Sequence, residues 1–284
     1  MHPDVEIVVQ AQNIVFQRFE GTAWESIFLV LSSGPALAGN TKYSADEISR
    51  ISERARMIIA DVSSMFSLLG RLDWMRRQAL QDEYAKTQWP AFAGLDIELF
   101  HVYLRSIMDY VADILKIVAE KPEEVRVGKE RWGSFERLLN WVLKNPGNRA
   151  RLGEEFAELV EETQSWFPLI RSLRDEITHH GAMTIVFNKP EDGILFQVFD
   201  SCLRRLIAQH ELIMYNENVA YFDRYAVLYL SHVVIFLQRL ASLMEKRLSL
   251  QLTGRATWRS YNDRGTVTAW IDSFVKMANS GQVS

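Results

Sequence analysis

"SADEISRISERARMIIADVSSMFSLLGRLDWMRRQAL", which runs from Ser44 to Leu80, is the stretch of sequence that decides the fold. It opens with Ser44-x-x-Glu47, the pattern of a capping box, in which each side chain accepts a hydrogen bond from the backbone N–H of the other residue. Apolar residues follow at helical spacing, at Ile48, Ile51, Ala55, Ile58, Ile59, Val62 and Phe66. The stretch therefore predicts one long amphipathic helix, with Gly70 as a position where it could bend.

The same helical period dominates the rest of the chain, which has only seven prolines and fourteen glycines. Further helices are predicted at residues 5–19, 24–31, 95–120, 134–144, 154–164, 165–180, 219–250 and 266–279, with breaks at 89–94 and 145–147. Ser134 and Ser165 are the expected N-caps of the helices that start with them. One β-hairpin is predicted at residues 183–199, where β-branched and aromatic runs flank "NKPEDG". The predicted fold class is therefore mainly α, a helical bundle with one small β-hairpin.

The break at residues 89–94 also suggests how the chain is divided. We expect an N-terminal helical region at residues 1–94, a helical bundle at 95–250 that includes the hairpin, and a C-terminal tail at 251–284. The tail ends in a short amphipathic helix that is expected to dock on the body of the protein.

The composition is that of a soluble globular protein, with 48% hydrophobic and 24% charged residues among 284. The formal net charge is −4, which argues against a strongly basic nucleic-acid surface but leaves room for a local basic pocket. The single cysteine, Cys202, cannot form an internal disulfide, and the N-terminus lacks the pattern of a signal peptide. A cytoplasmic location without a membrane partner is therefore expected.

The longest apolar run, at residues 225–237, is too short to span a membrane, so we expect it to form a buried helix. His101, His210 and His232 are isolated from other metal-ligating residues, and no spacing typical of a metal site occurs. We therefore expect neither a metal ion nor another cofactor.

"RSLRDEITHHG", from Arg171 to Gly181, is the stretch in which charged residues and histidines gather. On a helical wheel, the core-facing stripe consists of Trp166, Ile170, Leu173 and Ile177. His180 leans toward this stripe, whereas His179 lies on the opposite half with Asp175, four residues earlier, close enough to orient its imidazole. The simple alternative is a charged helix end, because cations and a final glycine are both favoured at a helix C-terminus.

Arg174-Asp175-x-x-x-His179 resembles the R-polar-x-x-x-H signature of the HEPN superfamily (higher eukaryotes and prokaryotes nucleotide-binding). The resemblance implies an all-α bundle, often a metal-independent ribonuclease of toxin–antitoxin or defence systems. It also implies a homodimer, single-stranded RNA as substrate and an antitoxin-like partner. The same spacing recurs from Arg205 to His210, but there the apolar Leu206 follows the arginine, so the first copy is the candidate.

The resemblance also implies a role for each side chain. His179 would act as general acid or base, Arg174 would hold the phosphate and Asp175 would orient His179, while Arg171 and His180 would contact the substrate. The 2′-OH of the RNA would be the nucleophile, so the product would carry a 2′,3′-cyclic phosphate. The alternative from the same superfamily is a non-catalytic dimerisation or interaction module. The acidic segment "EEFAELVEE" just before the motif favours that alternative, because it would repel RNA.

Overall fold

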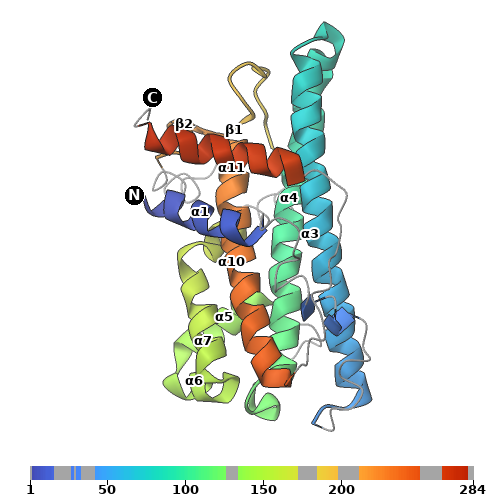
Figure 1. Cartoon of the computed structure of the whole chain (residues 1–284), viewed down its shortest axis with the longest axis vertical. Coiled ribbons are helices and arrows are strands. Elements are labelled where there is room, and N and C mark those ends of the chain that lie inside the picture. The colour runs from blue at the N-terminus through green and yellow to red at the C-terminus, as the bar shows by residue number, and fades with distance from the viewer. Residues whose placement is uncertain are drawn as a thin grey trace.

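The architecture is taken from a computed structural model, which describes residues 2–15, 27–28, 30–32, 42–125, 134–171, 184–197, 211–249 and 264–280. Two long antiparallel helices, α3 (Ala45–Ala79) and α4 (Glu83–Val118), form a hairpin whose tip extends beyond the rest of the molecule (Figure 1). The capping box at the start of α3 is confirmed, since the Ser44 N–H donates to Glu47 Oε2 at 2.8 Å and the Glu47 N–H donates to Ser44 Oγ at 3.3 Å.

The predicted break at residues 89–94 is wrong, because α4 continues through Pro90. A proline inside a helix removes one backbone hydrogen bond and costs about 3 kcal/mol. Its neighbours Trp89 and Ala93 are both buried, and their removal from water offsets much of this cost. The domain boundary expected at residue 94 thus falls inside a continuous helix, and the division into domains stays a prediction.

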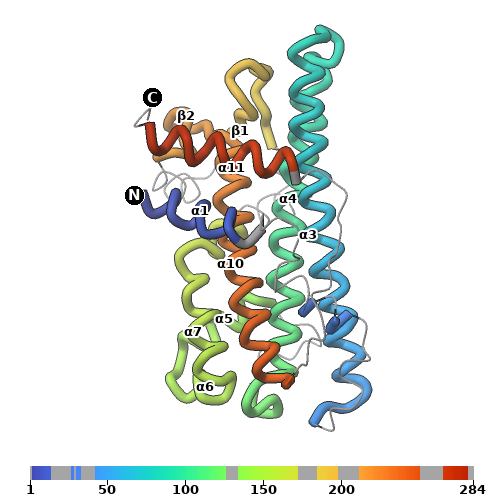
Figure 2. The backbone as a smooth tube through the Cα atoms, in the orientation of Figure 1, coloured from blue at the N-terminus to red at the C-terminus, as the bar shows by residue number. Residues whose placement is uncertain are grey.

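A third long helix, α10 (Phe222–Leu248), runs beside the hairpin, and smaller helices pack against it. Near one end, α1 (Pro3–Val15) and α11 (Arg264–Asn279) cross it, and α5, α6 and α7 lie toward the other end (Figure 2). The bounds of these three are Phe135–Lys144, Pro146–Leu152 and Glu154–Glu162, and two short 3-10 helices cover Pro122–Glu124 and Thr163–Ser165. Helix α10 is long and apolar enough to cross a membrane, but 67% of its most apolar window is buried inside the protein.

A small antiparallel sheet lies at the start of α10, with the strand order β1 (Leu195–Gln197), β3 (Val219–Tyr221), β2 (Met214–Asn216). The predicted hairpin is confirmed, since the Phe187 N–H donates to Leu195 O at 2.9 Å across it. The helix predicted from residue 219 begins only at Phe222. The three residues before it form β3, which pairs with β1 on one side and β2 on the other.

The buried hydrophobic side chains form one continuous cluster that extends from Val5 to Phe274. At its centre, the rings of Phe100, Phe222 and Tyr225 pack largely edge to face or stacked, with centroids 5.3 to 6.5 Å apart. Residues from α1, α3, α4, α10 and α11 all contribute to this core. The described chain before and after residues 172–183, which carry most of the candidate motif, therefore belongs to one packed body.

Candidate functional site

The candidate motif lies largely outside the described residues. Arg174, Asp175, His179 and His180 fall within residues 172–183, and the second copy of the spacing falls within 198–210. The structure does describe the chain on both sides of the motif, up to Arg171 and again from Thr184. The site can therefore be built from its two anchoring ends and from the side chains around them.

The approach to the motif is anchored in the core by aromatic side chains. Residues 167–171 are helical, and Trp166 and Ile170 are buried, as predicted for the core-facing stripe. The Phe167 ring packs edge to face on the Phe135 ring of α5, with centroids 4.8 Å apart. The expected N-cap role of Ser165 is not seen, because its hydroxyl donates to Glu162 O at 3.2 Å. Packing of the aromatic side chains therefore fixes the start of this helix.

Arg171, one of the expected substrate contacts, is paired with an acid. Its Nη1 atom lies 2.7 Å from Glu136 Oε1 of α5, and both side chains are partly exposed to solvent. A half-exposed ion pair of this kind contributes at most about 1 kcal/mol to stability. The pair is therefore weak enough for a phosphate group to compete with Glu136 for Arg171.

Arg105 lies beside the approach to the motif, and the sequence interpretation missed it. It lies on α4, is 9% exposed, and its guanidinium sits 5.0 Å from the centre of the Phe167 ring. Its Nη2 donates to Ser134 Oγ at 2.8 Å and its Nε donates to Asp109 Oδ2 at 3.2 Å, while the buried Nη1 has no hydrogen-bond partner. The available signal was an arginine four residues before an aspartate within a predicted helix.

The same group of residues explains how α5 begins. Ser134 occupies the N-cap position as predicted, but its hydroxyl makes no capping bond, because it accepts from Arg105. Asp109 of α4 supplies the cap, since its Oδ1 accepts the Phe135 N–H at 2.8 Å. Helix α5, which carries Glu136, is thus held in place by a carboxylate from another helix.

The chain rejoins the described body at Thr184, directly against α4. The Thr184 N–H donates to Glu98 Oε1 at 2.9 Å. A Cβ atom at Gly94 would lie only 2.6 Å from Thr184 O, so a glycine is needed for this close approach. Both ends of the motif-bearing segment therefore lie against α4, near Arg105 and near Gly94, which are about 16 Å apart along the helix axis.

The glutamates of α7 are more neutralised than the sequence suggested. Arg149 of α6 pairs with Glu154 and Glu161, Arg239 of α10 pairs with Glu162, and Lys246 of α10 pairs with Glu155. Each of these cations screens the acidic segment that would otherwise repel RNA. The ion pairs thus weaken the argument from "EEFAELVEE" against an RNA site.

A group of cations lies further along α4. Burial lowers the pKa of Lys116, Asp113 raises it, and the like charges of Arg50 and Arg137 lower it further. These cations from α3, α4 and α5 are thus close enough to interact, although two acids, Asp109 and the buried Asp113, also lie near Lys116. These three basic residues therefore do not form a strongly positive patch, because acids lie among them.

The isolated histidines behave as structural residues where they are described. His101 is fully buried, its Nδ1 donates to Ile97 O at 2.7 Å, and its Nε2 accepts from the Tyr225 hydroxyl at 3.0 Å. Burial lowers the pKa of His101 to about 4, so its ring is neutral at neutral pH. It has no access to a substrate, so it is not a candidate acid or base.

His232 lines a small pocket beside the approach to the motif. Its ring stacks on Trp166, with centroids 5.3 Å apart, in a pocket of about 240 Å³ that Gln10, Ser165 and Arg239 also line. Within the described residues, no three His, Cys, Asp or Glu side chains are grouped so that they could hold a metal ion.

None of the protein-family models, curated proteins or solved structures compared with this chain matches it.

Proposed function

We propose that this chain is a HEPN-like protein that cleaves or binds single-stranded RNA without a metal ion. The observation that carries the proposal is the motif Arg174-Asp175-x-x-x-His179 in a mainly helical protein. The described surroundings are compatible with it, because the chain on both sides of the motif is anchored on α4 and four of the five glutamates of α7 are paired. A homodimer and an antitoxin-like protein partner belong to the same proposal.

In the proposed reaction, His179 removes the proton from a ribose 2′-OH, and the 2′-oxygen attacks the adjacent phosphorus. Arg174 stabilises the negative charge that develops on the phosphoryl oxygens, and Asp175 orients the imidazole. The P–O5′ bond breaks, and the departing 5′-oxygen takes up a proton from water, while the protonated His179 returns its proton to the solvent. The products are a 2′,3′-cyclic phosphate and a 5′-OH end. Arg171 exchanges Glu136 for a substrate phosphate, and His180 contributes a second contact.

The test is cleavage of single-stranded RNA in excess EDTA by the parent protein and by His179→Ala and Arg174→Ala. Loss of a catalytic acid–base group or of a charge-stabilising arginine is expected to lower the rate by about 10²- to 10⁴-fold. His210→Ala is the matched control, because it removes the histidine of the second copy of the spacing and should leave the rate unchanged. Mass spectrometry of the products should show cyclic phosphate ends. An inert parent, or variants that cut as fast as the parent, would rule out catalysis at this motif.

A non-catalytic interaction module is the second candidate. Large apolar side chains that are exposed on the α3–α4 hairpin, among them Phe92, Leu95 and Val102, favour it, because exposed apolar side chains are suited to burial against a partner. A titration of the protein with single-stranded RNA at moderate salt distinguishes the two candidates, because the interaction module should neither bind the RNA nor cut it. Substitution of Arg174 should also leave the association of the module with proteins unchanged.

A further inference from the structure

One side of the α3–α4 hairpin carries a row of exposed apolar side chains. Phe92, Leu95, Leu99 and Val102 recur at helical spacing on α4, so they share one face of that helix, which we call the α4 ridge. Phe92 is 53% exposed, Leu95 60% and Val102 37%, and Leu99 is partly buried. Leaving such side chains in water is costly, so the ridge is suited to burial against another surface.

A groove of small side chains lies beside the ridge on α3. It has a volume of about 480 Å³, and small residues line it on α3, namely Ala60, Ser63, Ser64 and Ser67. Leu99 and Tyr103 of α4 form its other wall. This α3 groove therefore runs alongside the α4 ridge, and Leu99 belongs to both.

The ridge and the groove carry no net charge. Among the described residues that line them, only Arg71 is charged, and its Nε donates to Asp96 Oδ2 of α4 at 2.9 Å. In a two-fold interface each surface patch meets a copy of itself, so a net charge there would be self-repelling. This face avoids that repulsion although the whole chain has a formal charge of −4.

We propose that a second copy of this chain docks on this face, with the two-fold axis parallel to the hairpin. This interface deepens the homodimer of the proposed function, but it does not depend on RNA cleavage at the motif. That axis places the α4 ridge of each copy in the α3 groove of the other, so that large side chains meet small ones. An axis perpendicular to the helices would instead set ridge against ridge and leave both grooves empty. The proposed arrangement is a four-helix bundle in which neighbouring helices are antiparallel, a common way to pack long helices.

The size of the face sets the expected strength of association. From Phe92 to Val102 the α4 ridge is about 15 Å long, and a face two helices wide is about 20 Å across. The contact is therefore smaller than the roughly 800 Å² per partner of a standard stable interface. We expect a dissociation constant in the micromolar range.

Sedimentation velocity from about 1 to 100 µM tests the proposal, because this range brackets a micromolar dissociation constant. The parent should shift from monomer to dimer across the range, and Leu95→Asp and Val102→Asp should each raise the dissociation constant at least about tenfold, since a buried carboxylate opposes association. Leu143→Asp is the matched control, because Leu143 is an exposed leucine of α5, 42% exposed and outside the face, and this variant should dimerise like the parent. Far-UV circular dichroism confirms that each variant is folded.

A mixing experiment tests the orientation of the two copies. Val102→Glu changes the ridge and Ser63→Lys changes the groove, so each variant alone should self-associate more weakly than the parent. An equimolar mixture should recover dimers, because the new glutamate of one copy then meets the new lysine of the other. A parent that stays monomeric, or a Leu143→Asp variant as impaired as Leu95→Asp, would refute the interface. A mixture that fails to recover would refute the ridge-in-groove packing.

Discussion

Asp61 on α3 carries a carboxyl group that is partly removed from water, and burial raises its pKa from 3.8 to about 6. The folded state therefore holds the proton more tightly than the unfolded state. The contribution of this carboxyl group to the free energy of unfolding is therefore fully present below pH 4, where the group is protonated, and is lost as the pH rises through 6. At neutral pH the ionised Asp61 destabilises the fold.

Replacing this carboxyl group should therefore be stabilising. We expect Asp61→Asn to raise the free energy of unfolding at pH 7 by about 1 kcal/mol after allowance for solvent screening, and to have almost no effect at pH 4. Urea denaturation at the two pH values measures the difference. Glu53→Gln on the exposed side of α3 is the control and should change neither value. An equal gain at both pH values would contradict the assignment to a buried carboxyl group.

Residue patterns predicted local features well where the partners are near in sequence. The Ser44–Glu47 capping box is complete within four residues and is present as predicted. Ser134 was an equally reasonable cap by its type and position, yet Asp109 makes the hydrogen bond to Phe135. Because that carboxylate comes from another helix, local sequence around α5 gave no sign of it.

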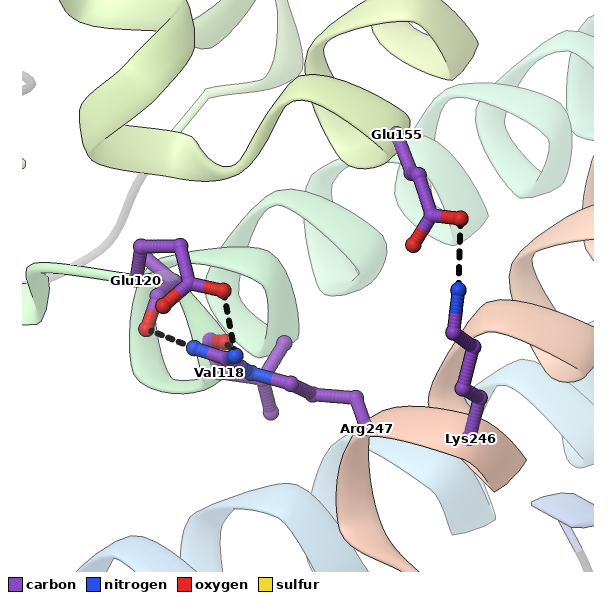
Figure 3. A network of polar contacts seen from close by, with 6 residues as sticks. Val118, Glu120, Glu155, Lys246 and Arg247 are labelled. Carbon is purple, nitrogen blue, oxygen red and sulfur yellow. Dashed lines mark hydrogen bonds and ion pairs between the residues drawn. The ribbon is translucent and has the colours of Figure 1, made fainter.

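At the scale of the elements, α10 is held to the end of α4 by Arg247. Its Nε donates to Val118 O at 3.0 Å and its Nη2 to Ala119 O at 2.9 Å, and Nη1 pairs with Glu120 (Figure 3). Carbonyls in the last turn of a helix lack intrahelical partners and attract positive charge. The neighbouring Lys246 pairs with Glu155, and both of these side chains are well exposed.

These two adjacent cations should therefore contribute very differently. We expect Arg247→Ala to lower the free energy of unfolding by about 2 kcal/mol, because two carbonyls and a carboxylate lose a charged donor. Lys246→Ala should leave the midpoint of chemical denaturation almost unchanged, since exposed pairs add little. Guanidinium denaturation of the two variants measures both effects. Equal losses would mean that the structural distinction between the two pairs is wrong.

The elements also show why proline and short strands limit sequence-based prediction. Pro90 indicated a break, but its neighbours Trp89 and Ala93 are buried, and their packing keeps α4 continuous. Strand β3 was predicted as the start of a helix, because its three residues adjoin a long apolar helical pattern. Its strand structure depends on pairing with β2, just before it, and with β1, more than twenty residues earlier, and three-residue strands are too short to show a periodicity of their own.

At the scale of the whole molecule, the C-terminal helix completes the core. Four apolar side chains of α11 are buried, namely Val267, Trp270, Ile271 and Phe274. They pack where α11 meets α1, α3 and α10, and the Gln12 amide donates to Asp272 Oδ1 at 2.8 Å across one of these contacts. Burial of four such side chains is worth roughly 6 to 12 kcal/mol, comparable to the entire stability of a typical domain.

Removal of residues 264–284, which include α11, should therefore abolish cooperative unfolding. The shortened chain should lose its sharp thermal transition and bind a dye that reports exposed apolar surface. Removal of residues 281–284 alone is the control and should leave the transition in place. A sharp transition in the longer truncation would mean that α11 is an accessory to the core.

The environment of the candidate site could be predicted only in part. The motif residues themselves come from the sequence, as does the buried stripe that includes Trp166 and Ile170. The pairing of Arg171 with Glu136, and the place of Arg105 beside Phe167, depend on contacts between separate helices. Such contacts are set by how the helices pack, which the spacing of residues along one helix does not reveal.

The cap that α4 supplies to α5 implies an order of events during synthesis. Helix α5 has ten residues, too few to persist alone in water, and its first backbone N–H is satisfied by Asp109. Helix α4 leaves the ribosome first, so this carboxylate is already in place when Phe135 emerges. The segment that follows α5, including the motif, would therefore acquire its anchors only after α4 has folded onto α3.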